Sequence, residues 1–246
     1  MLFFSKKPSP PDYSVLHTDM HAHLLPGIDD GSPDLDTSIE LIRSLQELGF
    51  SKLITTPHVM GDMYPNSPSI IRERLTAVQQ ALIRQEISQE LDAAAEYFLD
   101  EVMERRIRDN EPLLTLPGKR VLCEFSMLTP TMGVKEMIFE MQMQGYQVII
   151  AHPERYVYLG SNKGFYEELK DMGCLFQLNL LALTPHYGKT VSALAAYLIK
   201  KGYYDLVGTD LHNHRHAELL RDPKIGEGLK RVMDQCRIWN AEISLM

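Results

Sequence analysis

The sequence has few cysteines, and their spacing forms no recognisable motif. Three occur in 246 residues, Cys123, Cys174 and Cys236, and no two of them form a C-x-x-C pair. The sequence therefore indicates neither a disulfide framework nor a zinc knuckle. Cys123 and Cys174 lie in apolar runs, where a cysteine packs as a small core residue. This cysteine usage is most simply that of a cytoplasmic protein.

Long apolar runs are missing as well. No stretch approaches the roughly 20 apolar residues of a membrane span. At the start, the apolar segment 2–4 precedes Lys6 and Lys7, which reverses the order found in a signal peptide. We therefore expect no stable membrane insertion. Residues 1–14 are predicted to be a flexible tail, with weak membrane contact by 2–4 as the alternative.

An excess of positive charge is also absent. The chain has 25 lysines and arginines against 33 aspartates and glutamates, so its formal net charge is −8. Such a charge opposes nonspecific binding to nucleic acid. The sequence also has no basic, aromatic-rich segment that would form a nucleic-acid groove. A phosphoesterase acting on nucleic acid is therefore disfavoured, and no nucleic-acid partner is expected.

What the sequence does contain is a regular alternation of strand-like and helix-like segments. Hydrophobic residues make up 44% and charged residues 24% of the chain, as in soluble globular proteins. Apolar runs predict strands at 15–20, 52–55, 91–96, 120–125, 147–151, 174–178 and 205–209. Helical periodicity predicts helices at 34–48, 68–90, 100–108, 134–144, 164–172, 190–201 and within 224–237. A hairpin is predicted where 113–116 and 120–125 flank Pro117-Gly118.

This order predicts an α/β fold with a parallel sheet and helical crossovers. The seven inner strands are best explained by one closed barrel in a single domain over residues 15–246, because such barrels commonly reach about 250 residues. An open sheet is the alternative, but it would have to gather polar residues from six strands at one crevice. In a barrel, the carboxyl ends of the strands share one mouth.

Candidate metal ligands follow most of these strands. His21 and His23 are two residues apart, so on an extended strand end both imidazoles point to one face. Asp210 and His212 repeat this spacing. Each histidine taken alone is more often structural, but the same placement at four strand ends favours metal binding. The candidates are His21, His23, Asp30, His58, Glu96, Glu124, His152, Asp210 and His212.

This set is too large for one ion, because zinc takes about four ligands and larger hard ions take about six. Two or three ions that share a bridging carboxylate are implied. Imidazoles and carboxylates without a thiolate suit manganese, iron or zinc. The four carboxylates carry −4 and three divalent ions would carry +6, so the centre would be about +2. Such a centre could attract an anion to an acidic protein.

Side chains that could bind a substrate stand close to these ligands in the sequence. Arg155 and Arg215 each lie three residues beyond a candidate histidine ligand, where their forked guanidinium groups could bind phosphate. A surface salt bridge is the alternative for either arginine. Tyr64 and Tyr187 lie in loops that are predicted near the mouth. They could stack on an aromatic substrate, or simply pack within their loops.

These residues resemble the PHP (polymerase and histidinol phosphatase) superfamily. Within it they resemble the bacterial manganese-dependent protein-tyrosine phosphatases of capsule and exopolysaccharide operons, the CpsB/CapC/YwqE type. The resemblance covers about residues 15–220 and keeps the family's motif order. It rests on Asp19-Met20-His21-Ala22-His23, Pro26-Gly27-Ile28-Asp29-Asp30-Gly31, Thr56-Pro57-His58, Glu124-Phe125, Ala151-His152-Pro153-Glu154-Arg155 and Asp210-Leu211-His212-Asn213.

The resemblance implies a distorted seven-stranded (β/α)7 TIM-like barrel, the PHP fold, with three divalent ions, most simply Mn2+. Arg155 matches a family arginine that grips the phosphate. Two departures are visible: Ala94-Ala95-Glu96 stands where the family has Gly-x-Glu, and the family's second arginine lies further beyond the Asp-x-His motif than Arg215. The implied ligand sets are His21, His23, Glu96 and Asp210 for one ion, Glu96, Glu124 and His152 for a second, and Asp30, His58 and His212 for a third.

Together these features predict a metal-dependent phosphomonoester hydrolase, most simply a protein-tyrosine phosphatase whose partner is a bacterial tyrosine kinase of exopolysaccharide synthesis. A metal-bridging hydroxide would attack phosphorus in line, and Asp210, His212 or a metal-bound water would protonate the leaving group. A cysteine nucleophile is disfavoured, because Thr129, Leu180 and Glu242 stand where a C-x5-R motif needs arginine. The alternatives are a small-molecule phosphatase such as histidinol phosphatase and a non-catalytic phosphotyrosine-binding module. A homo-oligomer is compatible with the sequence.

Overall fold

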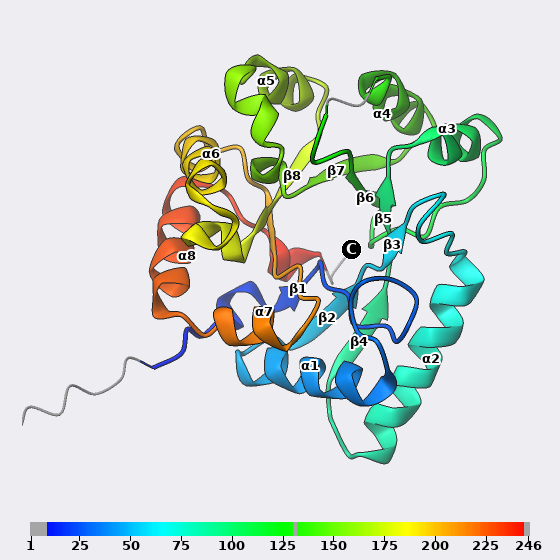
Figure 1. The fold of residues 1–246 in the computed structure, drawn as a ribbon, viewed down its shortest axis with the longest axis vertical. Helices are drawn as coiled ribbons and strands as arrows, with labels where there is room; N and C mark the ends of the chain where they lie inside the picture. Colours follow the sequence, from blue (N-terminus) through cyan, green and yellow to red (C-terminus); the bar gives the residue numbers. More distant parts are fainter. Residues whose placement is uncertain (1–8, 130–131, 244–246) are drawn as a thin grey trace, which may run out of the picture.

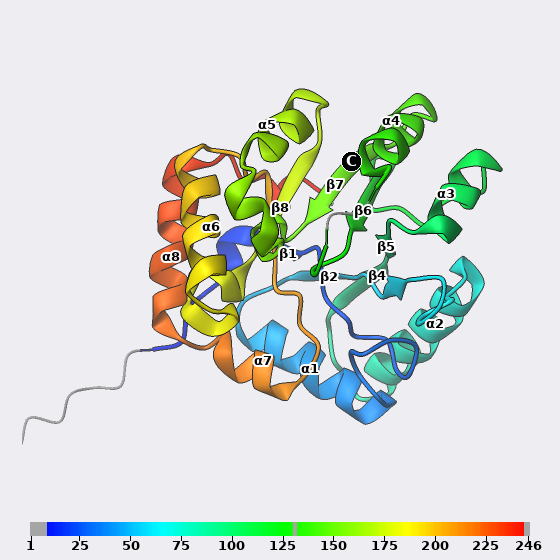
Figure 2. The same ribbon diagram turned by 45° about the horizontal axis from the view of Figure 1, so that its top comes forward.

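The computed structural model describes residues 9–129 and 132–243. Within these ranges nine strands pair in parallel, and helices lie outside them (Figures 1 and 2). The strands are β1 (Thr18–Asp19), β2 (Lys52–Thr55), β3 (His58–Val59), β4 (Glu90–Ala93), β5 (Glu96–Phe98), β6 (Arg120–Glu124), β7 (Gln147–Ala151), β8 (Leu175–Asn179) and β9 (Leu206–Gly208). The α-helices are α1 (Leu35–Glu47), α2 (Pro68–Arg84), α3 (Glu101–Arg108), α4 (Val134–Met143), α5 (Gly164–Asp171), α6 (Lys189–Lys200), α7 (His214–Leu219) and α8 (Pro223–Gln235).

The nine strands of the described residues differ from the seven that the sequence predicts, because the predicted strand 91–96 is divided into β4 and β5, and the short strand β3 follows the predicted strand 52–55. Pro57, which has no N–H to donate to a ladder, separates β2 from β3. Ala94 and Ala95 separate β4 from β5. Since β2 pairs with β4 and β3 pairs with β5, both interruptions fall at the same level. The result is two parallel sheets, ordered β1-β2-β4 and β3-β5-β6-β7-β8-β9.

The predicted hairpin is reduced to a turn. Leu116 and Arg120 form a single antiparallel bridge, and the residues before Leu116 form no strand. Gly118 has a φ of 75° and Lys119 a φ of 55°, so both lie in the left-handed region. Glycine adopts this conformation without strain. The chain therefore reverses tightly and enters β6 directly.

Ordered packing begins earlier than predicted. The predicted tail covers residues 1–14, and its first part, residues 1–8, lies outside the described residues. Tyr13, by contrast, is fully buried, and its hydroxyl donates a hydrogen bond to the Leu220 carbonyl at 2.6 Å. The 3-10 turn Ser14–Leu16 stands where the sequence predicts the start of a strand. No helix of the described ranges is long and apolar enough to cross a membrane.

The central strands are buried on both faces. In β6, Val121 and Cys123 belong to the main hydrophobic core, which also contains the buried residues of the helices, whereas Leu122 belongs to a second core. This alternation is the period of a β-strand. Both faces of parallel strands are typically covered in α/β proteins. The second core comprises Met20, Ile54, Ala94, Leu116, Leu122, Ile149, Ala151, Leu206 and Ile243.

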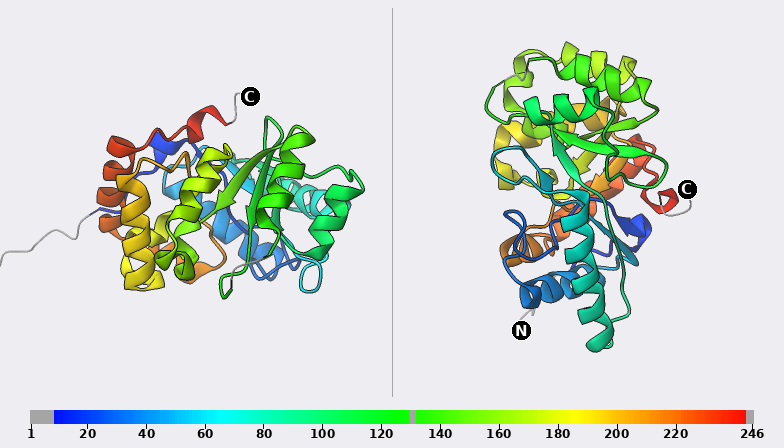
Figure 3. Two further views of the ribbon diagram at one scale, coloured as in Figure 1. Left: turned by 90° about the horizontal axis from the view of Figure 1, so that it is seen from above. Right: turned by 90° about the vertical axis from the view of Figure 1, so that its right-hand side faces the viewer.

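Segments from the two ends of the chain lie side by side (Figure 3). Asn240, in the 3-10 turn Asn240–Glu242, donates through Nδ2 to the carbonyls of Thr18 at 2.9 Å and Val207 at 2.6 Å. Its Oδ1 accepts the N–H of Val207 at 2.8 Å. One buried side chain thus links β1 to β9, the strands that precede the pairs His21/His23 and Asp210/His212.

Candidate metal centre

The structure brings all nine candidate ligands together. Glu96 begins β5, Glu124 ends β6 and His58 begins β3, while the other candidates lie in the segments that follow β1, β7 and β9. Their donor atoms form four overlapping groups, within each of which the atoms lie within 4.8 Å of one another. The groups are His23, Asp30, His58 and His212; His21, His23 and Glu96; His21, His152 and Asp210; and His58, Glu96 and Glu124.

Glu96 occupies the middle of this cluster. Its Oε2 atom lies 3.2 Å from Nε2 of His21 and 3.2 Å from Nδ1 of His58. Its Oε1 atom lies 3.2 Å from Nε2 of His152. The side chain has no solvent exposure. One buried carboxylate therefore contacts imidazoles from three parts of the chain.

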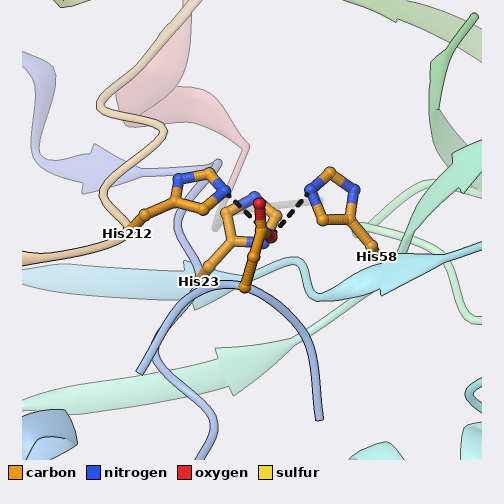
Figure 4. Close-up of side chains that lie close together, drawn as sticks. His23, His58 and His212 are labelled. Carbon is orange, nitrogen blue, oxygen red and sulfur yellow. Dashed lines mark ion pairs between the residues drawn. The ribbon is translucent and has the colours of Figure 1, made fainter. Parts of the chain in front are cut away.

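Asp30 lies at the more exposed side of the cluster. Its Oδ1 atom is 3.4 Å from Nε2 of His58 and 3.5 Å from Nε2 of His212. Figure 4 shows His58 and His212 approaching from opposite sides, with His23 beside them. The rings of His23 and His212 are stacked, with centroids 3.9 Å apart. This group therefore combines a carboxylate with three imidazoles.

Without a metal ion, the carboxylates and imidazoles of the cluster stabilise each other's charged forms. Burial alone would raise the pKa of Glu96, but His21 and His58 hold it well below its usual value. Burial opposes protonation of His58, yet the Glu96 charge raises its pKa to about 10. Burial likewise opposes protonation of His23, and Asp29 raises its pKa well above the usual value. The raised pKa values of His23 and His58 favour the protonated form of imidazoles that metal ions would need in neutral form.

The donor set fits divalent ions. Nδ1 of His152 is buried and has no hydrogen-bond partner. Oε1 of Glu96 and Nδ1 of His58 are also buried, and their contacts are with other candidate ligands of the cluster. A buried polar group without a partner is costly, and a bound cation would compensate a carboxylate oxygen such as Glu96 Oε1. Imidazole nitrogens and carboxylate oxygens are the ligands that manganese, iron and zinc accept. The cluster can therefore hold metal ions.

A pocket of about 410 Å³ opens next to the cluster. Arg155, whose side chain is 27% exposed, lines it and places Nη1 2.9 Å from Oδ2 of Asp210. The guanidinium lies over the ring of Tyr187, 4.7 Å from its centroid. Tyr64 also lines the pocket, with its ring stacked on His58 at 5.7 Å. The pocket thus has a cationic group and two tyrosine rings beside the candidate ligands.

Arg215 does not share this position. Its side chain is exposed and is not among the residues that line the pocket, whereas His216, the next residue along α7, is among them. The predicted contact of Arg215 with a phosphate therefore has no support in the geometry. Arg155 is the one arginine among the described residues that line this pocket.

A family model for capsular polysaccharide synthesis proteins, CpsB/CapC, matches residues 17–238. The chain belongs to the CpsB/CapC family. The match spans every element from β1 to α8. All nine candidate ligands, from His21 to His212, lie inside it.

Named relatives and a solved structure agree with this assignment. The chain is 28% identical to the tyrosine-protein phosphatase YwqE of Bacillus subtilis over 195 residues, which cover 79% of this chain and 77% of that protein. It is 27% identical to the tyrosine-protein phosphatase CpsB of Streptococcus agalactiae over 230 residues, 91% of each chain. Its fold matches a chain from the crystal structures of YwqE and of Streptococcus pneumoniae CpsB, described as metal-dependent tyrosine phosphatases. That match has a TM-score of 0.73 at 24% identity and covers 90% of this chain and 96% of the other.

Two side chains that orient the ligands of this CpsB/CapC family member are not found by sequence reasoning. Asp29 is not among the candidate ligands, but its buried carboxylate pairs with Nδ1 of His23 at 2.8 Å. Gln177, in the middle of β8, places Oε1 2.9 Å from Nδ1 of His21. The same oxygen accepts the N–H of His152 at 3.2 Å. A buried glutamine inside an apolar strand is the one signal that could have indicated this role.

Proposed function

We propose that this chain is a metal-dependent protein-tyrosine phosphatase that acts on a tyrosine-phosphorylated protein of a capsule or exopolysaccharide system. The observation that carries the proposal is the cluster of nine candidate ligands with Arg155 beside it in one pocket. Membership of the CpsB/CapC family and the names of the relatives support it. A bacterial tyrosine kinase in the cytoplasm is the proposed partner.

The proposed centre holds three divalent ions, most simply Mn2+, with iron or zinc as alternatives. Glu96 would bridge two ion sites, since it contacts three imidazoles. A (β/α)7 barrel is the proposed fold. The second core supports it, and so does the hydrogen bond from the N–H of His23 to the Leu211 carbonyl at 2.9 Å, which joins the segments after β1 and β9. The ligand sets are His21, His23, Glu96 and Asp210; Glu96, Glu124 and His152; and Asp30, His58 and His212.

The chain's own residues would bind the phosphate and the ring. When bound, divalent ions lower the pKa of coordinated water and offset negative charge on phosphoryl oxygens. Nη1 of Arg155 donates a hydrogen bond to Oδ2 of Asp210 at 2.9 Å, which fixes the guanidinium group. Its remaining N–H groups would bind the phosphate. Tyr64 would flank the aromatic ring of the substrate. The leaving phenolate needs little assistance, and the proposed sources of its proton are Asp210, His212 and coordinated water.

The test measures metal content and hydrolysis of a phosphotyrosine peptide on the same samples. Glu96→Ala and His152→Ala should each lower the metal content and abolish hydrolysis. Glu73→Ala, an exposed position on α2, serves as the matched control. Retained hydrolysis in Glu96→Ala would refute the proposal. Turnover of histidinol phosphate without turnover of peptides would assign the site to small molecules, and metal-free, inactive protein would favour a binding module.

A further inference from the structure

The rim of the pocket carries apolar side chains that neither the metal centre nor the phosphate needs. We propose that four of them bind an apolar residue next to the phosphotyrosine of the substrate protein. They are Met60, Met63, Phe98 and Met127, and we call them the methionine shelf. The inference rests on the proposed phosphatase function and adds a selectivity to it.

The methionine shelf occupies one continuous side of the pocket. Met60 and Met63 follow β3, Phe98 ends β5 and Met127 follows β6, and these strands are neighbours in the sheet. Arg155, Tyr187 and Asp210 come from the segments after β7, β8 and β9, which are the next neighbours in the sheet. His58 and Glu124, on β3 and β6, also line the pocket, as candidate metal ligands. A substrate whose phosphate lies at the polar side would therefore extend its adjoining residues over the shelf.

The loop that carries Met63 has a fixed backbone. Met60 and Tyr64 exchange backbone hydrogen bonds of 3.0 Å in both directions, which closes the loop at its base. The N–H of Gly61 donates to Oδ2 of Asp100 at 2.9 Å. A Cβ at Gly61 would collide with Val102, so this close approach requires glycine. Met63 is nevertheless 64% exposed at the loop tip.

The loop that carries Met127 is held in a similar way. Tyr158 donates its hydroxyl to the carbonyl of Ser126 at 2.8 Å, and Oγ of Ser126 accepts the N–H of Leu128 at 3.2 Å. Leu128, the next residue after Met127, is 87% exposed. The backbone next to Met127, at Ser126 and Leu128, and the base of the loop that carries Met63 are therefore held by hydrogen bonds before any ligand binds the shelf.

The chemistry of the shelf indicates what it binds. Exposed apolar side chains that gather beside a pocket mark an interaction site more often than a chance surface. The methionine thioether is flexible and polarisable, so three methionines can adapt to several apolar shapes. The net charge of −8 gives no reason to expect acidic flanking residues. We therefore assign the shelf to aliphatic or aromatic residues that adjoin the phosphotyrosine.

The experiment compares two phosphotyrosine peptides that differ only at the positions on either side of the phosphotyrosine, which hold leucine in one and glycine in the other. For the unmutated protein loaded with Mn2+, kcat/KM should be about tenfold higher for the leucine peptide, mainly through KM. The double variant Met63→Ser/Met127→Ser should bring this ratio close to one. Met143→Ser is the matched control, because Met143 is 70% exposed on α4 and lies outside this pocket.

The outcomes of this experiment test the methionine shelf and the phosphatase function separately. A leucine preference that disappears in the double variant and persists in Met143→Ser supports the shelf. Equal turnover of both peptides by the unmutated protein, or a preference that survives in the double variant, overturns the shelf and leaves the phosphatase function standing. Failure to hydrolyse either peptide with Mn2+, iron or zinc present refutes the phosphatase function itself, and the shelf with it.

Discussion

The Nδ1 atom of His23 lies 2.8 Å from Oδ2 of Asp29, and the same carboxylate oxygen accepts the backbone N–H of His58 at 3.2 Å. One buried carboxylate thus positions two candidate ligands. With Nδ1–H donated to Asp29, Nε2 of His23 faces the cluster, 3.4 Å from Oε2 of Glu96. Carboxylates placed in this way fix the tautomer and the ring orientation of metal-binding histidines.

Asp29→Ala should weaken Mn2+ binding about 10- to 100-fold, because His23 loses the partner that holds its ring. Competition with a fluorescent chelator measures this affinity without reference to catalysis. Asp29→Asn keeps an oxygen acceptor and should lose less. Asp62→Ala, at an exposed aspartate, is the control. Unchanged affinity in Asp29→Ala would show that Asp29 only shapes its turn.

Arg155→Ala should lower kcat for a phosphotyrosine peptide by about 100- to 1000-fold, the loss typical for removing one donor to a transition-state oxyanion. Arg155→Lys keeps the charge but not the fork, and should fall between the two proteins. Binding of inorganic phosphate, measured by calorimetry, should weaken in the same order. Arg84→Ala, at an exposed arginine on α2, should match the unmutated protein. A loss below threefold in Arg155→Ala would contradict the phosphate-binding role.

The convergence of the candidate ligands could be predicted because it depends on topology alone. Short apolar runs that alternate with helices indicate parallel strands, and parallel strands present their carboxyl ends on one side. His152 and Asp210 directly follow such runs, and both lie in the cluster. The starts of α1 and α2 could be predicted from local sequence, because Asp34 and Ser67 are residue types that cap helices, and both cap the helices that follow them.

The orientation of residues between elements could not be predicted in this way. Arg155 and Arg215 stand at the same interval from a histidine, but Arg155 lies in the 3-10 turn Pro153–Arg155 and Arg215 lies on α7. The short α7 was not predicted, and it leaves Arg215 exposed while His216 lines the pocket. The division into two sheets could not be predicted from Pro57 alone. It also needs the interruption at Ala94 and Ala95, which lies in the neighbouring strand but far along the chain.

Tyr13→Phe should lower the free energy of unfolding by about 1 kcal/mol, because the buried hydroxyl no longer bonds to the Leu220 carbonyl. Tyr13→Ala removes the ring as well and should cost about 3–5 kcal/mol. Tyr203→Phe, at a partly exposed tyrosine, should stay within about 0.5 kcal/mol. Urea unfolding followed by fluorescence gives these values. Full stability in Tyr13→Ala would mean that the segment before residue 15 does not contribute to the fold.

Metal removal should change the pH dependence of stability through His58 and Glu96. In the metal-free protein the charge of Glu96, acting against burial, raises the pKa of His58 to about 10. The pKa of a histidine in the unfolded chain is about 6.5. The stabilisation from this pair is therefore complete below about pH 6.5 and is lost as the pH rises through about 10. The pKa of Glu96 is lowered, so its contribution is present above about pH 4.3 and is lost as the pH falls further.

Metal binding depends on pH in the opposite sense to the stabilisation by His58: it strengthens as the pH rises, because the imidazoles must release their protons before they can coordinate an ion. The difference in Tm between Mn2+-loaded and chelator-treated protein should therefore widen steadily from pH 6 to pH 9. His58→Gln removes one of these protons and should flatten the trend, whereas His214→Gln, at an exposed histidine on α7, should leave it unchanged. A Tm difference that stays constant over this range would show that the protonated imidazoles do not compete with the metal ions.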